Sequence, residues 1–291
     1  MNKYSLTFIL SLLLSTFTLQ SASQQWMRFH CQEDTMKINN LLKKGFDSNI
    51  EDANELITFY ANELLGTPYV AHTLEGDEEL LTINIDETDC TVFIETLYAL
   101  ARTTLNDRYS WRDFANNLES IRYRNGHMDG YASRLHYISD WIVDNTHRGN
   151  IKEITSELPD ARYEIKTLDY MTSHRDSYPA LSDSATYAEL KSFEIGYRLH
   201  RFPYIKKESV DSKKIKEKLK TGDIIALVSK TEGLDVTHMA IIVQDEKGKF
   251  HMLHASSTEK KVVIEKDDLK ETLRRNRNWT GIRIIRLKTG Y

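Results

Sequence analysis

Three side chains in this sequence have the chemistry of a thiol-dependent enzyme: Cys90, His238 and His254. Cys90 lies in ETDCTVFIETLYAL, where the apolar spacing after the cysteine predicts a helix that begins close to it. The positive end of a helix lowers the pKa of a nearby thiol and favours the thiolate. Cys90 is therefore a candidate nucleophile, and it needs a base from another part of the fold.

Both histidines lie in segments with the composition of β-strands, THMAIIV at 237–243 and FHMLHAS at 250–256. The turn EKGK between them predicts a hairpin that brings the two rings together across the ladder. His238 is then the candidate base and His254 the residue that orients its ring, while His251, on the opposite face, is the weaker candidate. Each residue alone has a structural interpretation, because cysteines and strand histidines are often buried and inert, but the ordered set favours catalysis.

The same residue types could bind a metal, but no CxxC, HxH or HExxH spacing occurs in the chain. We therefore expect neither a metal nor an organic cofactor. A disulfide between Cys31 and Cys90 is not expected either, because a chain of 291 residues buries enough apolar surface to be stable without one.

The composition, 40% hydrophobic and 28% charged with a formal net charge of -4, is typical of a globular protein. The charges are spread along the chain, which argues against a nucleic-acid groove or a basic membrane-binding patch. Residues 1–22 combine Lys3, an apolar run and small residues, which is the pattern of a secretory signal peptide. Because the run is short for a membrane span, we expect no membrane insertion of the mature chain. The mature chain is expected to be periplasmic or otherwise exported, and we expect it to be a monomer.

The remaining chain, 23–291, is expected to form one α+β domain. Helical spacing occurs at 35–46, at 53–66 and after Cys90; a mostly helical insertion is expected over about 105–205, and a charged helix over 206–220. Over 221–291 the pattern predicts an antiparallel sheet or a small barrel. Its β-rich runs are DIIALVS, THMAIIVQD, KFHMLHAS, KKVVIE and GIRIIRL.

Five short motifs resemble, in this order, those of the NlpC-type cysteine peptidases and amidases of bacterial cell walls. They are GTPYV at 66–70, DCT at 89–91, TGDIIAL at 221–227, THMAIIV at 237–243 and LHASS at 253–257. The segment YRNGHMDGYASRLHYISDW at 123–141 resembles the insertion of a narrower branch, described as N-acetylmuramoyl-L-alanine amidase-like. The resemblance implies the family's papain-like α+β core, with N-terminal helices, a helix-borne nucleophile and a C-terminal antiparallel sheet.

The resemblance also implies a reaction, hydrolysis of the amide bond between the lactyl group of N-acetylmuramic acid and L-alanine. The substrates it implies are peptidoglycan fragments, disaccharide peptides with an anhydromuramyl end above all. Carried over by motif, Cys90 is the nucleophile, His238 the base and His254 the third residue. Tyr69 corresponds to a tyrosine beside the cysteine, and Asp89 and Thr91 are expected beside the substrate.

Several residues of the insertion have side chains suited to sugar recognition: Arg134, His136, Tyr137, Asp140 and Trp141. An aromatic ring can stack on a pyranose, while Arg and Asp side chains bond its hydroxyl and acetamido groups. The alternative is a structural helix with a buried ion pair, and the sequence supports both interpretations equally.

Other functions are weaker alternatives. Cleavage between γ-D-glutamate and the diamino acid of the stem peptide uses the same triad, but it has little use for a sugar-binding insertion. A non-catalytic peptidoglycan-binding protein has no need of a complete Cys/His/His set. An acyltransferase would be expected to have an acceptor or lipid surface, for which the sequence has no signal.

Overall fold

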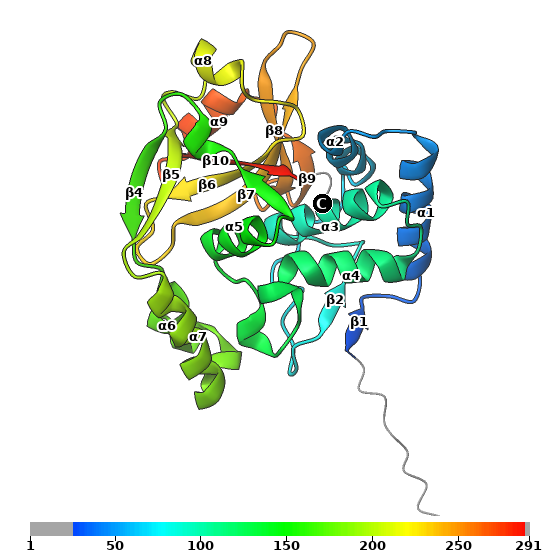
Figure 1. The fold of residues 1–291 in the computed structure, drawn as a ribbon, viewed down its shortest axis with the longest axis vertical. Coiled ribbons are helices and arrows are strands. Elements are labelled where there is room, and N and C mark those ends of the chain that lie inside the picture. Colours follow the sequence, from blue (N-terminus) through cyan, green and yellow to red (C-terminus); the bar gives the residue numbers. More distant parts are fainter. Residues whose placement is uncertain (1–25, 289–291) are drawn as a thin grey trace, which may run out of the picture.

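The structure, a computed structural model, describes residues 26–288, and the predicted signal peptide at 1–22 lies outside them. Figure 1 shows the N-terminal helices on one side of the molecule and the C-terminal strands on the other. The predicted α+β class is confirmed.

The main sheet of the described residues is antiparallel, with the strand order β4-β5-β10-β6-β7-β8-β9 and with β3 paired to β10. The turn after Gln244 joins β7 to β8 as predicted, with the Asp245 N–H bonded to the Lys249 carbonyl at 2.9 Å. The five predicted β-rich runs are β6 to β10, so the sheet prediction is confirmed. The strands are β3 (Ile151–Glu153), β4 (Arg162–Lys166), β5 (His200–Lys206), β6 (Ile224–Ser229), β7 (Val236–Gln244), β8 (Phe250–Ser256), β9 (Lys261–Ile264) and β10 (Trp279–Leu287).

Helices α2 (Ala53–Glu63) and α3 (Cys90–Leu105) pack on one face of this sheet. Helices α1 (Asp34–Asp47) and α4 (Trp111–Arg122) pack on α3. Helix α3 is buried on nearly every side and contacts α1, α2, α4, β7 and β8, as expected of a helix that is apolar all round. Two short parallel strands, β1 (Met27–Phe29) and β2 (Leu81–Ile83), lie beside the helices.

Both faces of the central strands β6, β7, β8 and β10 are buried, which explains why long parts of these strands are continuously apolar. Met239 and Ile241 of β7 pack toward the helices, together with Leu253 of β8. The alternate residues Ala240 and Ile242 pack on the other face, against α9 (Leu269–Arg275), a helix that the sequence did not predict.

The expected helical insertion over 105–205 is only partly correct. It contains α5 (Ile138–His147), α6 (Tyr170–Ser173) and α7 (Ser184–Gly196), but also β3, β4 and β5. Strand β5 lies between β4 and β10, with Phe202 and Ile205 buried, so sheet pairing determines the local structure there.

The expected charged helix over 206–220 is wrong, because only α8 (Lys213–Lys216) is helical. Val210, Ile215 and Leu219 are buried against the sheet, and turns at 206–212 bring them there. The Lys-rich composition is that of a solvated helix, but burial of Val210, Ile215 and Leu219 against the sheet is incompatible with one continuous helix over 206–220.

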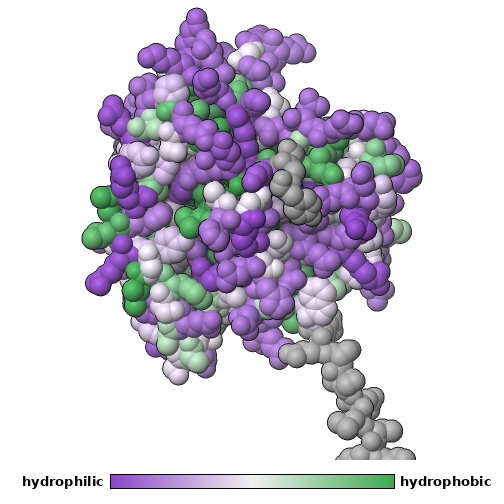
Figure 2. Space-filling model, in the orientation of Figure 1, coloured by the Kyte–Doolittle hydropathy of each residue, from purple (hydrophilic) through white to green (hydrophobic). Residues whose placement is uncertain are grey.

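Most of the surface seen in Figure 2 is hydrophilic, with hydrophobic side chains in small separate groups. Among residues 26–288, no helix has both the length and the apolar character needed to cross a bilayer.

A buried ion pair fixes α3 to α4. The Arg122 Nε donates to Glu95 Oε2 at 2.6 Å, and its Nη1 donates to the carbonyl of Thr82 at 2.7 Å. Both charged side chains are at most 3% exposed, so each depends on the other for compensation of its charge.

We predict that Glu95→Ala lowers the free energy of unfolding by about 3–5 kcal/mol, because it leaves the Arg122 guanidinium buried without its counterion. Urea denaturation followed by circular dichroism measures this. Lys43→Ala removes an exposed pair with Asp47 and is the control that should change stability far less. Equal effects of the two substitutions would contradict this account.

Candidate active site

Cys90 is the first residue of α3, as the sequence predicted. Asp89 caps the helix, because its Oδ1 accepts from the N–H groups of Thr91 at 2.9 Å and Val92 at 2.8 Å. The Thr91 hydroxyl lies 4.0 Å from the Cys90 sulfur. Thr91 thus lies beside the thiol, and one Asp89 oxygen is committed to the cap; contact of either residue with substrate stays a prediction.

Tyr69 reaches Cys90 because its loop lies between two elements of the core. The Tyr69 N–H donates to the carbonyl of Lys260 at 2.9 Å, and the Val70 N–H donates to the carbonyl of Thr88 at 3.0 Å. Burial raises the pKa of the Tyr69 phenol, and the neighbouring Cys90 adds to this increase. The phenol therefore lies within electrostatic reach of the thiol.

The Cys90 thiol is protonated at neutral pH, which differs from the expectation of a lowered pKa. Burial, with the Asp89 carboxylate as a second cause, raises the pKa of Cys90 to about 11. Hydrogen bonds from the backbone N–H of Met239 and from Thr91 act in the opposite direction. The effect of desolvation on the Cys90 pKa is larger than that of the helix N-terminus, because burial disfavours a thiolate that has no counterion.

The predicted pairing of the two histidines is present. Nε2 of His238 and Nδ1 of His254 are 2.6 Å apart, and the two rings are perpendicular. Trp279 stacks on the His238 ring with its centroid at 5.9 Å, which restricts rotation of the imidazole. His251 instead lies among the carbonyls of Glu265 and Asp267, away from this pair.

Glu265 completes the arrangement, and sequence reasoning did not select it. Its Oε1 is 3.0 Å from His254 Nε2, and this hydrogen bond is the main cause of the lowered pKa of the Glu265 carboxyl. The only signal in the sequence is an acid directly after the strand run KKVVI. Whether this acid reaches His254 depends on the register of β9 against β8, in which His254 pairs with Val263.

The Glu265 carboxylate determines the tautomers of both rings. It accepts a hydrogen bond from Nε2–H of His254, so Nδ1 of His254 carries no proton. This Nδ1 is therefore the acceptor for Nε2–H of His238. Nδ1 of His238 is then unprotonated, and it has no hydrogen-bond partner among the described residues. Burial, with His254 as the second cause, lowers the pKa of His238 to about 3, so this ring is a neutral base at neutral pH.

The thiol and the histidine pair meet through Met239, the residue after His238. Its backbone acts to lower the pKa of the Cys90 thiol, and α3 packs against β7. No hydrogen bond joins the sulfur directly to an imidazole in the part of the chain that is described. The resting arrangement is therefore a neutral thiol beside a neutral base.

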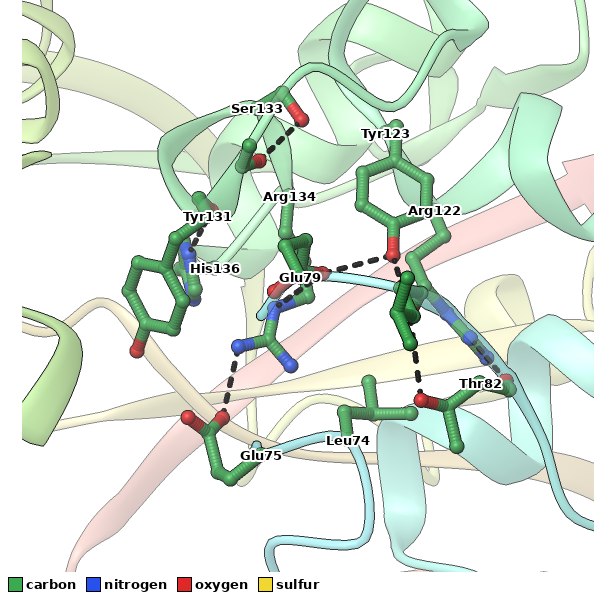
Figure 3. A network of polar contacts seen from close by, with 12 residues as sticks. Leu74, Glu75, Glu79, Thr82, Arg122, Tyr123, Tyr131, Ser133, Arg134 and His136 are labelled. Atoms are coloured by element: carbon green, nitrogen blue, oxygen red, sulfur yellow. Dashed lines mark hydrogen bonds and ion pairs between the residues drawn. The ribbon is translucent and has the colours of Figure 1, made fainter. Parts of the chain in front are cut away.

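Arg134, predicted to bind sugar, lies in a buried polar network (Figure 3). Its Nη2 is 2.8 Å from Glu75 Oε1, and its Nε is 3.5 Å from Glu79 Oε1. The guanidinium also lies over the ring of Tyr131 at 4.9 Å. Burial raises the pKa of Asp89, and the positive charge of Arg134 acts to lower it. The network is therefore within electrostatic reach of the residue that caps the Cys90 helix.

Three of the other insertion residues serve the core instead of a sugar. Trp141 is 0% exposed, so it cannot present a face to a pyranose. The Tyr137 hydroxyl donates to Glu194 Oε1 at 2.7 Å. Asp140 is buried and paired with Arg124. The expectation of sugar contacts by Tyr137, Asp140 and Trp141 is therefore corrected in favour of the structural alternative.

His136 is held inside the loop. Its Nε2 is 2.9 Å from the carbonyl of Tyr131, and the two rings lie 4.5 Å apart (Figure 3). Burial, followed by the charge of Arg134, lowers the pKa of His136 to about 3. A neutral His136 supports the Tyr131 ring, which lines a cavity.

This cavity, of about 760 Å³, lies between the 76–80 loop, the 128–131 loop and the 179–186 segment. We call it the acidic cavity, because among the described residues its charged lining consists only of carboxylates. These are Asp77, Glu78, Glu79, Asp129 and Asp183.

The comparisons with known proteins decide the family. A family model described as N-acetylmuramoyl-L-alanine amidase-like matches residues 60–282. The chain belongs to this family. No curated protein matches it.

Of three solved structures that are similar to this chain, one is named as an amidase. An N-acetylmuramoyl-L-alanine amidase from Bacteroides uniformis ATCC 8492 is 39% identical with a TM-score of 0.76, over 81% of this chain and 99% of its own. A Bacteroides fragilis protein proposed to be a xylanase is 40% identical with a TM-score of 0.73, over 78% and 99%. A Legionella pneumophila protein at 22% identity and a TM-score of 0.67, over 88% and 95%, shares the fold.

The second cysteine lies away from this site. Cys31, Asp34 and Asp86 offer ligand atoms within 4.8 Å of one another, but Lys37 Nζ is 2.6 Å from both Asp86 oxygens. The lysine ammonium thus supplies the positive charge that a metal would bring. Neither Cys31 nor Cys90 forms a disulfide within the described residues.

We predict that Glu265→Gln lowers kcat for amide hydrolysis by about tenfold with little change in KM, because the His254–His238 pair loses the charge that fixes its tautomers. The acid limb of the pH profile should also move to lower pH, since the imidazolium loses a stabilising carboxylate. Steady-state kinetics across pH measures both effects. Glu246→Gln, an exposed change in the β7–β8 turn, is the control; a profile unchanged in Glu265→Gln would argue against a positioning role.

Proposed function

We propose that the protein is a cysteine amidase that hydrolyses the bond between N-acetylmuramic acid and L-alanine in peptidoglycan fragments, anhydromuropeptides above all. Membership of the amidase-like family supports the class of reaction. The observation that carries the cysteine mechanism is the packing of α3, whose first residue is Cys90, against β7, whose His238 is oriented by His254 and Glu265.

Acylation begins with both groups neutral. As the Cys90 sulfur attacks the lactyl carbonyl carbon, its proton moves to Nδ1 of His238, and the carbonyl oxygen becomes an oxyanion. The C–N bond then breaks, and the imidazolium gives its proton to the amine of L-alanine. A thioester of the muramoyl lactyl group and a free stem peptide result.

Deacylation reverses the roles of the same groups. His238 accepts a proton from water, the hydroxide attacks the thioester carbonyl, and the Cys90 thiolate leaves and regains a proton from His238. The N–H of Cys90 is a donor for the oxyanion, because Asp89 occupies those of Thr91 and Val92. The Tyr69 hydroxyl, with no partner among residues 26–288, is available as a second donor.

We assign the sugar end of the substrate to the acidic cavity. A muramoyl residue whose lactyl carboxyl is in an amide carries no charge, so carboxylates can accept from its hydroxyl groups without repulsion. Tyr131 lines this cavity and contacts Arg134, which connects it to the Cys90 helix. A cavity of about 760 Å³ is within the range of small-molecule sites.

A papain-like core of the NlpC type and export through residues 1–22 are part of this proposal. The first is supported by the order of the helix-borne cysteine and the strand-borne histidines. The second is supported by the sequence pattern of 1–22 alone.

Glycoside hydrolysis, proposed for one relative, is less well supported. It needs two carboxylates that face the glycosidic bond, one of them as the acid. The acidic cavity supplies carboxylates, but the family model and the Bacteroides uniformis relative are both described as amidases, which supports the amide bond over the glycosidic bond.

We predict that the mature protein converts a defined anhydromuropeptide into free disaccharide and an intact stem peptide, and that Cys90→Ala lowers the rate at least about a thousandfold. Mass spectrometry of the products distinguishes the bonds. Cys31→Ala is the matched control and should retain activity, because Cys31 lies beside Lys37 and not in the site. A cut within the peptide would support the endopeptidase, and a cut between the sugars the glycosidase.

We predict that kcat/KM stays nearly constant from about pH 8 down to about pH 5. Burial and His254 hold the pKa of His238 below the ordinary value of 6.5, so the base remains unprotonated at lower pH. The rate falls only as the pH approaches the lowered pKa and the imidazolium forms. An acid limb at pH 6.5 or above, with circular dichroism showing intact protein, would contradict this.

A further inference from the structure

A second cavity, of about 610 Å³, lies beside the histidine pair and has no part in the mechanism above. Two of its lining residues, Glu265 and Trp279, are those that contact His254 and His238. The cavity lies between the β8–β9 turn and the segment that joins α9 to β10. Its other lining residues are Thr258, Glu259, Thr272, Arg275, Asn276 and Arg277.

The location of this histidine-side cavity follows from two contacts. The β8–β9 turn, which provides Thr258 and Glu259, continues into Lys260, whose carbonyl accepts from the N–H of Tyr69. Tyr69 in turn lies beside Cys90. The cavity therefore adjoins the reacting centre from the side of the histidines. The acidic cavity lies beside Tyr131, which contacts Arg134.

The charges of the histidine-side cavity differ from those of the acidic cavity. Arg275 is paired with Asp267, and Glu265 is engaged by His254. Arg277 is exposed and has no ion-pair or hydrogen-bond partner among the described residues. Glu259 is exposed, and its carboxylate is also unpaired within that part of the chain. One cation and one anion are thus available to a ligand.

The chemistry of the proposed reaction determines which half of the substrate lies here. His238 must give its proton to the leaving amine, so that amine has to lie on the histidine side of the tetrahedral carbon. The chain that follows L-alanine then continues past Trp279. Unlike the sugar, the stem peptide carries free carboxylates and the ammonium group of its diamino acid.

We propose that the histidine-side cavity is the subsite for the stem peptide, with Arg277 binding one of its carboxylates. The inference rests on the proposed function, because it takes the peptide to be the leaving group. Arg277 presents a fork of donors that matches a carboxylate, and the Glu259 carboxylate is available to the ammonium of the diamino acid. The two cavities thereby match the two unlike halves of one substrate.

The test compares Arg277→Gln with Arg274→Gln in the mature protein. Arg274 is an exposed arginine at the end of α9 that is paired with Glu271 and does not line the cavity. The ligand is the free stem peptide L-Ala-γ-D-Glu-diaminopimelate-D-Ala, measured by isothermal titration calorimetry. We expect Arg277→Gln to weaken its binding about tenfold and Arg274→Gln to leave it unchanged.

A peptide with all its carboxylates amidated identifies the cause. It should bind the original protein and Arg277→Gln equally, whereas an equal loss for both peptides would mean damage to the fold and would overturn the assignment. Unchanged binding of the acidic peptide to Arg277→Gln would overturn it as well. On the anhydromuropeptide, KM should rise about tenfold with kcat nearly constant.

This experiment separates the subsite from the proposed reaction. Peptide binding is measured without turnover, and repeating it in Cys90→Ala removes any cleavage. If the protein cuts a different bond but Arg277 still controls peptide affinity, the subsite stands and the reaction is wrong. If the protein releases the disaccharide but Arg277→Gln binds the peptide normally, the reaction stands and the subsite is wrong.

Discussion

Helix α3 is buried on nearly every side, and this burial brings its first residue, Cys90, against strand β7. The helix cannot shift without exposing its apolar faces or separating Glu95 from Arg122. Its N-terminus is further fixed by the Asp89 cap. The rest of the site depends on this constraint, since Cys90 stays beside Met239 and the histidine that precedes it only while α3 stays against the sheet.

Desolvation determines how the reactive groups are poised. It raises the pKa of Cys90 and lowers that of His238, so both are neutral before substrate arrives. The hydrogen bonds that join His238, His254 and Glu265 determine that Nδ1 of His238 is the nitrogen free to accept a proton. A neutral thiol that loses its proton only during attack fits a site that must stay inert until a substrate covers it.

The two cavities beside this centre have unlike walls, and the difference follows from the elements that form them. The acidic cavity is lined by loops of the N-terminal half and the insertion, which contribute only carboxylates as charged groups. The histidine-side cavity is lined by the β8–β9 turn, which contributes Glu259, and by the end of α9 and the segment after it, which contribute Arg275 and Arg277. The insertion itself is held by buried residues such as Trp141 and Asp140, while Tyr131 and Glu79, which both lie beside Arg134, line the acidic cavity.

The sequence by itself determined the α+β class, the helix start at Cys90, the five C-terminal strands and the hairpin that pairs His238 with His254. Each of these depends on local periodicity or on a short turn, which neighbouring residues specify. Only the tertiary structure decided the rest. Strand β5 formed where a helix was expected, because pairing with β4 and β10 outweighed local preference, and Trp141 lies in the core instead of a sugar site. Glu265 entered the site through the register of β9, and burial reversed the expected shift in the Cys90 pKa. Register, burial and the approach of distant segments are properties of packing between elements, which no single stretch of sequence specifies.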